Sequence, residues 1–249
     1  MQKNLLNRYV VDLLKSIERN LSIYLKNMNP ECLHHLRVDL KKIKATLSFA
    51  ENVYKEDYNI TKIKPLYSKA GKIREIQINS HLLELFAHPP KKLIEQLKIK
   101  ENILSLKLIK RGSRYLKLIK KYCQIINLPE KLPNKKIINN YFKKEKHRAN
   151  SQLKNKERQD LHQYRTKIKK LMYVYYALPK RIKKEIELNE GEINMQQEKL
   201  GDWHDTYSAI KFISHKHFSM DTNESVLKLK EKEKIQFIAL LKNLTNNHI

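Results

Sequence analysis

The chain has 249 residues, of which 52 are Lys or Arg and 26 are Asp or Glu, so its formal net charge is +26 with His neutral. No apolar run approaches the roughly 20 residues of a membrane-spanning helix, and we expect no membrane partner. The start lacks the continuous apolar segment and small-residue cleavage site of a signal peptide, so we expect a cytoplasmic protein.

The excess of positive charge indicates a polyanionic partner, because a compact fold with charges of one sign repels itself. Nucleic acid, an anionic membrane and a phosphate polymer are the usual partners of such a chain. The many Lys, Asn and Ile residues also fit a lysine-rich composition with no special role. Total charge therefore does not decide the partner, and the positions of the charges must.

Long segments rich in Leu, Ile, Lys, Glu and Gln, with only four Gly, predict an all-α fold. Asn29 and Pro30 have the chemistry of a helix N-cap and a first helical position. Prolines and polar clusters separate four helices in the first half of the chain. The expected ranges are 4–26, 30–54, 61–88 and 91–126.

The segment NLPEKLPN, residues 127–134, contains two prolines and is expected to connect two halves. After it the helical pattern resumes, with a short extra helix expected at 181–188. The longer helices are expected at 135–153, 157–178, 190–218 and 223–243. Four helices on each side predict an internal duplication into units 1–128 and 129–249.

A repeated motif supports the duplication. LHHLRVDLKKIK, residues 33–44, recurs 128 residues later as LHQYRTKIKKLM, residues 161–172, with five of twelve positions identical. A second pair, AGKIRE at 70–75 and LGDWHD at 200–205, shares the pattern Gly-x-x-basic-acidic. Glycine inside a helix costs about 1 kcal/mol relative to Ala, so we expect close packing or close ligand approach at these two glycines.

Each copy of the motif is amphipathic when successive residues are placed about 100° apart on a helix. The cationic residues fall on one stripe, and the apolar residues fall on the opposite face. In the first copy the apolar face is Leu36, Leu40, Ile43 and Leu47, and in the second it is Tyr164, Ile168, Leu171 and Tyr175. Asp39, the only acid within the first motif, lies off the stripe, and Lys167 takes its place in the second copy.

The stripes are better suited to an anion than to water. A solvated helix face usually alternates Glu with Lys four residues apart, whereas these like charges stand three, four and seven residues apart without an acid among them. Arg matches phosphate oxygens in pairs, Lys adds point charge, and a His beside an anion gains charge as its pKa rises.

Other candidate sites carry less weight. His204 and Asp205 form an HD pair like those of metal phosphohydrolases, but the further ligands that such a site needs are missing from the pattern, and we expect no cofactor or metal. Trp203 is expected in the core. Cys32 and Cys123 lack metal or redox spacing and are expected to be covered free thiols in a reducing compartment. The basic runs Lys143–Arg148 and Ile109–Arg114 either widen the positive surface or are merely solvated.

The motif His-x-x-Arg-Val-x-x-Lys-Lys-x-Lys, residues 34–44, resembles the hallmark of the CHAD domain, the conserved histidine α-helical domain. Its landmarks occur in order at residues 34–44, 71–75, 162–170 and 201–205, so the resemblance covers nearly the whole chain as one domain, 1–249. The resemblance implies two four-helix bundles related by a pseudo-twofold axis, with a basic channel between them. The N-terminal Glu-x-Glu-x-Lys signature of triphosphate tunnel enzymes is absent, which favours a stand-alone module.

The resemblance further implies non-catalytic binding of inorganic polyphosphate and association with polyphosphate granules. Phosphate or sulfate would be able to occupy the same site. The residues implied are His34, Arg37, Lys41, Lys42, Lys44, Arg74, His162, Arg165, Lys169, Lys170 and His204. Met172 departs from the pattern where a basic residue matching Lys44 is expected, and Tyr164 and Thr166 replace aliphatics, so the second half is expected to bind less tightly.

Two alternatives stay open at this point. The first is a nucleic-acid binder for RNA or single-stranded DNA, which usually interleaves aromatic side chains with basic ones so that bases can stack. Tyr164 and Tyr175 fall on the apolar side and only Tyr173 lies in the stripe, which disfavours it. The second is an enzyme acting on polyphosphate, which would need clustered carboxylates or an activated nucleophile that the stripes lack.

Overall fold

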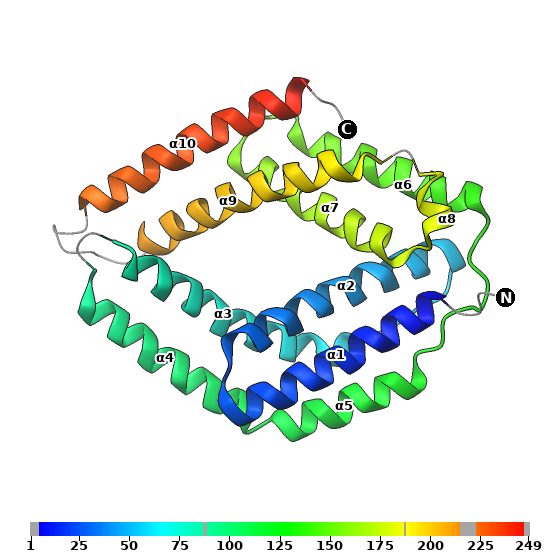
Figure 1. The fold of residues 1–249 in the computed structure, drawn as a ribbon, viewed down its shortest axis with the longest axis horizontal. Coiled ribbons are helices and arrows are strands. Elements are labelled where there is room, and N and C mark those ends of the chain that lie inside the picture. The colour runs from blue at the N-terminus through cyan, green and yellow to red at the C-terminus, as the bar shows by residue number, and fades with distance from the viewer. Residues whose placement is uncertain (1–4, 87–88, 187, 215–222, 247–249) are drawn as a thin grey trace. The chain divides into compact units, whose positions relative to one another are not determined.

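The structure, a computed structural model, describes residues 5–86, 89–186, 188–214 and 223–246 (Figure 1). Within these ranges it is helical and contains no strand, so the all-α prediction is confirmed. Its helices are α1 (Leu5–Asn27), α2 (Pro30–Tyr54), α3 (Lys64–Glu84), α4 (Lys91–Ile109), α5 (Gly112–Ile125), α6 (Lys135–Asn150), α7 (Arg158–Ala177), α8 (Lys180–Lys183), α9 (Glu190–Ser214) and α10 (Asn223–Asn246). None of the helices in the described ranges combines the length and the hydrophobicity that crossing a membrane requires.

The chain folds into two compact units. Unit 1 comprises residues 1–78, 96–141 and 170–185, and unit 2 comprises residues 79–95, 142–169 and 186–249. Four limits of the units fall within α3, α4, α6 and α7, and the fifth, between residues 185 and 186, falls between α8 and α9. The duplication boundary at residues 128 and 129 stays a prediction.

The start of α2 follows directly from its sequence. The side chain of Asn29 accepts a hydrogen bond from the backbone N–H of Glu31 at 2.9 Å, and Pro30 occupies the first helical position. This cap satisfies one of the backbone donors that every helix leaves open at its N-terminus. The predicted start of the motif helix is thereby confirmed.

The predicted helix at 91–126 is wrong as one element, because it is broken between α4 and α5. Gly112, the first residue of α5, packs so closely on α1 that a Cβ there would lie 2.5 Å from both methyl carbons of Leu25. The break lets the buried face of α5, which includes Tyr115 and Ile119, pack along α1. The sequence signal was the Gly-Ser pair at 112 and 113.

The other helix limits differ from the predicted ones by smaller amounts. Residues 61–63 and 151–153 form 3₁₀ turns beside α3 and α6, and the short helix α8 ends at Lys183 rather than at residue 188. The predicted extension of the 190–218 helix beyond residue 214 lies outside the described residues.

The core of unit 1 includes α1 packed against both α2 and α5. The connector at 127–134 is held to this unit by two hydrogen bonds. Asn7 Oδ1 accepts from the backbone N–H of Leu128 at 3.0 Å, and the Tyr54 hydroxyl donates to the carbonyl of Lys131 at 3.0 Å. Both thiols are free, with Cys32 buried and Cys123 half-buried, as predicted from their spacing.

Unit 2 is organised around a buried carboxylate, Glu233 of α10. Arg158 of α7 donates to its two oxygens from Nε at 2.9 Å and Nη2 at 2.8 Å, and Trp203 of α9 donates from Nε1 at 2.8 Å. Trp203 is fully buried, so its assignment to the core is confirmed. A buried carboxylate is costly unless its oxygens are paired in this way, and here one acid joins three helices.

Candidate functional site

The two copies of the motif lie on α2 and α7, and both predicted apolar faces are buried. All eight apolar positions listed from the sequence are at most 6% exposed. Burial of these faces leaves the opposite, cationic stripes at or near the surface. On the stripes, His34 and Lys44 are exposed, while Arg37, Lys41, Lys42, His162, Arg165, Lys169 and Lys170 are half-buried.

Arg37 is held against α3 in a defined position. Its guanidinium carbon lies 5.2 Å from the ring centroid of Tyr67, within the range of a cation–π contact. A Cβ on Gly71 would lie 2.8 Å from Arg37 Nη1, closer than real Cβ atoms come to a neighbour. Gly71 therefore marks close packing, as predicted, and the group it accommodates is the motif arginine itself.

His34 faces a second basic group from α3. Desolvation of its ring lowers the pKa of His34, and the charge of Arg74 lowers it further. Arg74 in turn lies 3.6 Å from Glu31 at the start of α2, measured from Nη1 to Oε1. The structure thus brings His34 and Arg74 together, and the lowered pKa favours the neutral form of the imidazole.

The remaining cations of the first copy differ in their surroundings. Lys42 Nζ lies 3.6 Å from a carboxylate oxygen of Asp39, which is buried. Lys44 is exposed, and Lys41 is half-buried. Part of the charge of Lys42 is therefore balanced within the protein, which the sequence pattern did not predict.

In the second copy, His162 of α7 stacks on His204 of α9. Their ring centroids are 4.9 Å apart, and their planes are inclined by 21°. Desolvation lowers the pKa of His162, followed by the charges of His204, Arg165 and Lys211. Unit 2 thereby repeats the arrangement of unit 1. In each unit the motif His lies near a basic residue of a later helix, and these two basic residues, Arg74 and His204, occupy equivalent positions in the second repeated motif.

Asp205 completes the second cluster. Its Oδ1 lies 3.4 Å from His204 Nδ1, and its pKa is lowered first by this contact and then, against an opposing effect of burial, by the charges of His204, Arg165 and Lys169. Desolvation and the charge of Arg165 lower the pKa of Lys169, while Asp205 raises it. Asp205 therefore offsets part of the repulsion among these cations.

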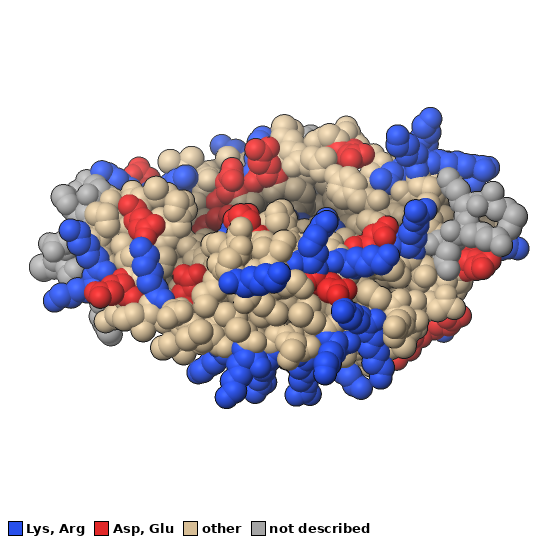
Figure 2. All heavy atoms as spheres, turned by 60° about the horizontal axis from the view of Figure 1, so that its bottom comes forward, with Lys and Arg blue, Asp and Glu red and all other residues tan. Residues whose placement is uncertain are grey.

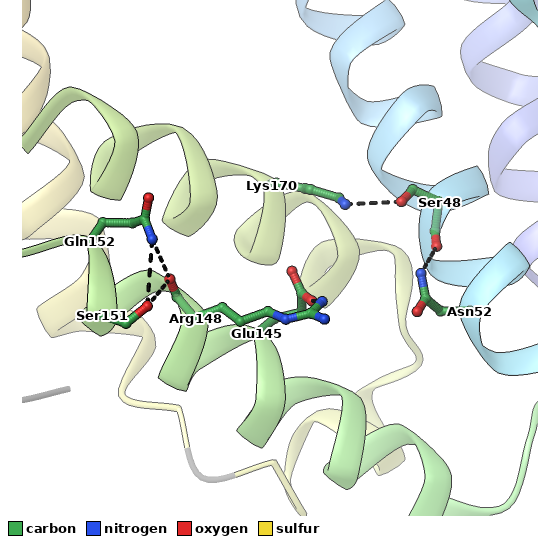
Figure 3. A network of polar contacts seen from close by, with 7 residues as sticks. All are labelled: Ser48, Asn52, Glu145, Arg148, Ser151, Gln152 and Lys170. Carbon is green, nitrogen blue, oxygen red and sulfur yellow. Dashed lines mark hydrogen bonds and ion pairs between the residues drawn. The ribbon is translucent and has the colours of Figure 1, made fainter. Parts of the chain in front are cut away.

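Lys170, the last cation of the second motif, lies in unit 1. Its ammonium group donates to the Ser48 hydroxyl at 2.9 Å, and Asn52 donates to the carbonyl of Ser48 at 2.9 Å (Figure 3). The predicted site residues thus fall into two groups. Unit 1 contains His34, Arg37, Lys41, Lys42, Lys44, Arg74 and Lys170, and unit 2 contains His162, Arg165, Lys169 and His204.

Two sequence-based interpretations of the second copy need correction. A Cβ on Gly201 would meet no atom within 4 Å among the described residues, so close packing does not account for this glycine, and the alternative expectation of close ligand approach stays a prediction. Met172, interpreted as a charge missing from the stripe, is only 4% exposed. Its side chain belongs to the core, and a lysine at that position would have to be desolvated or displaced.

Sequence reasoning missed two neighbours of the stripes. Tyr67 lies one helical turn before Gly71, and Glu31 is the first acid of α2. Lys211, in contrast, was expected from helical spacing to share a face with His204. Helical spacing from Gly71 would have found Tyr67, because residues four apart share a face. No local signal predicts the contact between Glu31 and Arg74, which depends on how α2 and α3 pack.

The run at 143–148 contains an internal ion pair, since Arg148 Nη1 donates to Glu145 Oε1 at 2.6 Å (Figure 3). Among the described residues, no three His, Cys, Asp or Glu side chains gather to hold a metal ion. Figure 2 shows one face of the molecule, on which Lys and Arg side chains gather along the lower edge while acidic ones are scattered.

Comparison with known proteins identifies a family and solved structures of similar fold. The model of the CHAD domain matches residues 8–214. The crystal structure of the CHAD domain from the plant Ricinus communis superposes with a TM-score of 0.60 at 14% sequence identity, covering 98% of this chain and 86% of that one. No curated protein is detectably similar in sequence.

Proposed function

The chain belongs to the CHAD family, and from that premise we propose that it binds inorganic polyphosphate without catalysing a reaction on it. The observation that carries the proposal is the recurrence of one arrangement in both units. A motif His with a lowered pKa faces a basic residue of another helix, Arg74 in unit 1 and His204 in unit 2. Cations from two helices converge in each case, which suits a ligand carrying many phosphate oxygens.

The proposed architecture is two pseudo-symmetric helical bundles with the basic stripes of α2 and α7 lining a channel. A flexible polyanion would lie along the stripes, with Arg37 and Arg165 binding phosphate oxygens in pairs and Lys41, Lys44 and Lys169 adding charge. Non-catalytic binding is proposed because these groups neutralise phosphate and none of them is a nucleophile beside a base. Association with polyphosphate granules would follow from such binding.

Nucleic acid is the alternative ligand, and one observation favours it. Tyr176 of α7 is 39% exposed, and the ammonium group of Lys183 lies 5.4 Å from the centroid of its ring. An exposed aromatic ring beside a cation is able to stack a base. This cluster lies beyond the motif, so nucleic-acid binding through it would survive changes in the stripes.

The test compares long-chain polyphosphate, RNA and single-stranded DNA at several salt concentrations, with and without Mg²⁺. Replacing Arg37→Glu together with Arg165→Glu is expected to weaken polyphosphate binding by about 100-fold or more, because each charged hydrogen bond contributes about 1.5–3 kcal/mol. Phosphate release in the presence of Mg²⁺ would contradict a non-catalytic role. Tighter binding of RNA than of polyphosphate would contradict the proposed ligand.

A matched control separates the site from total charge. Lys143 and Lys144 are both exposed and lie off the motif, so Lys143→Glu with Lys144→Glu changes the net charge by the same amount. The control is expected to retain most of the binding at physiological salt, where distant surface charges are screened. Equal losses in the two double variants would mean that net charge, and not the stripes, determines binding.

A further inference from the structure

Helices α4 and α5 carry an exposed surface that the motif does not explain. Ile99, Ile103 and Leu106 of α4 are 56%, 47% and 52% exposed. They stand four and three residues apart, so they form one stripe on one side of the helix. Three large apolar side chains in line leave a continuous apolar strip in contact with water.

The segment that follows Glu101 is acid-free and strongly cationic. Residues 102–129 contain no Asp or Glu. Six exposed cations lie in this segment beside or beyond the strip: Lys107, Lys110, Arg111, Arg114, Lys117 and Lys121. Lys120 is also exposed but lies 3.5 Å from Glu18 of α1, so its charge is partly balanced. We call the three apolar and six cationic residues the α4–α5 surface.

Helix α5 presents its cations on one side only. Arg114, Lys117 and Lys121 are three and four residues apart and share a face. The opposite face, with Tyr115, Ile119 and Tyr122, is buried. The lysines and arginines of α5 are therefore directed away from the core of unit 1 and are available to a partner.

Helix α3 adds to the crowding of positive charge. The pKa of Lys69 is lowered by desolvation and then by the charges of Arg111, Lys107 and Lys72. Cations from α3, the end of α4 and the start of α5 thus lie close enough to repel one another. Such an arrangement becomes favourable when an anionic surface neutralises it.

We propose that the α4–α5 surface binds an anionic lipid bilayer. Lysine and arginine attract anionic headgroups, while Ile and Leu side chains enter the boundary between headgroups and acyl chains. The long stems of Lys and Arg allow their charges to stay at the headgroups as the apolar strip approaches the bilayer. This proposal departs from the expectation, based on composition, that the protein has no membrane partner. In the proposed complex, the α4–α5 surface lies on the bilayer, and no helix spans it.

Other occupants fit the surface less well. RNA and polyphosphate would neutralise the cations and leave Ile99, Ile103 and Leu106 in water, and the tyrosines of α5 at 115 and 122 are buried and unavailable for stacking. A second copy of the same surface would bring cations against cations. A bilayer needs no fixed complementarity, because its lipids diffuse to match the charges they meet.

The test is flotation of the 249-residue chain with vesicles of phosphatidylcholine alone or with added phosphatidylglycerol, at low and physiological salt. Binding is expected only to the anionic vesicles. Lys117→Gln with Lys121→Gln is expected to weaken it by about 25-fold, since each cation near an anionic surface contributes about fivefold. Ile103→Gln with Leu106→Gln is expected to weaken it about tenfold.

Arg37→Glu with Arg165→Glu serves as the control and is expected to bind anionic vesicles normally, so this inference does not depend on the proposed function. The helical circular dichroism signal and thermal midpoint check that each variant is folded. Hydrogen exchange should slow within residues 99–121 on adding anionic vesicles. The proposal is overturned if anionic vesicles are not bound, if binding is lost in the control variant, or if it is insensitive to the Ile103 and Leu106 changes. RNA binding through Lys117 and Lys121 without vesicle binding would also overturn it.

Discussion

The two copies of the basic motif place their equivalent arginine and glycine in different surroundings. In unit 1, Arg37 lies over Tyr67 and against Gly71, so its guanidinium has one defined position. In unit 2, the matched glycine, Gly201, leaves open space, and Gln197 occupies the position equivalent to Tyr67. Neither amide atom of Gln197 has a hydrogen-bond partner among the described residues, although both are buried. The same sequence pattern thus supports close packing in one unit and a looser arrangement in the other.

The motif histidines His34 and His162, by contrast, have similar surroundings in the two units. Each has a lowered pKa, caused first by desolvation and next by the basic residue that matches across the repeat. The two copies of the motif therefore agree more closely in the pairing of His with a second cation than in the packing of Arg on Gly. The pairing of His with a second cation is therefore common to both units, whereas the close approach of the motif arginine to the following helix's glycine is seen in unit 1.

The largest expected change in the free energy of unfolding follows from replacing Glu233, the carboxylate that supports α9 in unit 2. The residue before His204 is Trp203, whose N–H needs an acceptor, whereas the equivalent residue in unit 1 is the buried Ile73. Glu233→Ala would leave the buried Trp203 N–H without its acceptor, while Arg158, whose side chain is 43% exposed, would be solvated, so we expect the free energy of unfolding to fall by about 2–4 kcal/mol. Urea denaturation measures it, and a change below about 1 kcal/mol would contradict a supporting role for Glu233.

A smaller change in stability is expected at Met172, where the second copy of the motif lacks the lysine found at position 44 in the first copy. Because Met172 is buried and the equivalent Lys44 is exposed, Met172→Lys should destabilise the fold by about 1–3 kcal/mol and should not strengthen polyphosphate binding. The matched change Lys44→Met should leave stability within about 0.5 kcal/mol. Thermal unfolding and polyphosphate titrations of both variants check this. Tighter binding by Met172→Lys would restore the view that the second stripe lacks a charge.

The shared histidine pairs predict a pH dependence. Because the folded protein lowers the pKa of His34 and His162, the unfolded chain takes up more protons, so stability is highest above about pH 6.5 and falls as the pH decreases below it. A bound polyanion favours the charged imidazoles, so its binding should take up protons and strengthen as the pH falls from about 8 to about 6. The gain is about tenfold for each His whose pKa rises by one unit.

Calorimetry in two buffers of different ionisation enthalpy measures that proton uptake. His34→Gln with His162→Gln should remove most of it while leaving the titration of the terminal phosphates in place. Unchanged proton uptake in this double variant would assign the effect to other groups.

The smallest effects distinguish the two glycines. Gly201→Ala meets open space in a helix and should stabilise the protein by up to about 1 kcal/mol without changing polyphosphate affinity. Gly71→Ala must displace Arg37 from its position over Tyr67, and we expect it to weaken polyphosphate binding by about fivefold with little change in stability. Parallel melting and binding measurements provide the comparison. Equal binding by the two variants would show that the position of Arg37 against α3 is unimportant.

The fold class and the motif faces could be predicted because they depend on local periodicity. Buried Leu36 and its equivalent Tyr164 follow from helical spacing alone, as does the cap at Asn29. The break between α4 and α5 could not be predicted with the same confidence, because it depends on the approach of Leu25 from α1 to Gly112. The burial of the Met172 side chain could not be predicted for the same reason, because it depends on neighbours far away in the sequence.

For the candidate site, the sequence predicted a set of cations and not the contacts that those cations make. The repeat identified His34 with Arg74 and His162 with His204 as members of the same pattern, and the structure brings each pair together. The balancing acids were missed for different reasons. Asp39 stands three residues before Lys42 on one helix, so helical spacing could have identified their contact. The contact of Glu31 with Arg74 depends on how α2 and α3 pack, which periodicity does not supply.

The hydrogen bonds of Glu233 also indicate which residues unit 2 needs in order to fold. The family match ends at residue 214, whereas Glu233 belongs to α10, which begins at Asn223. A chain shortened to the matched residues would therefore lose the acceptor that Arg158 and Trp203 share, and would uncover the face of α9 that packs on α10. The physical boundary of the second unit lies beyond the boundary that sequence similarity assigns to it.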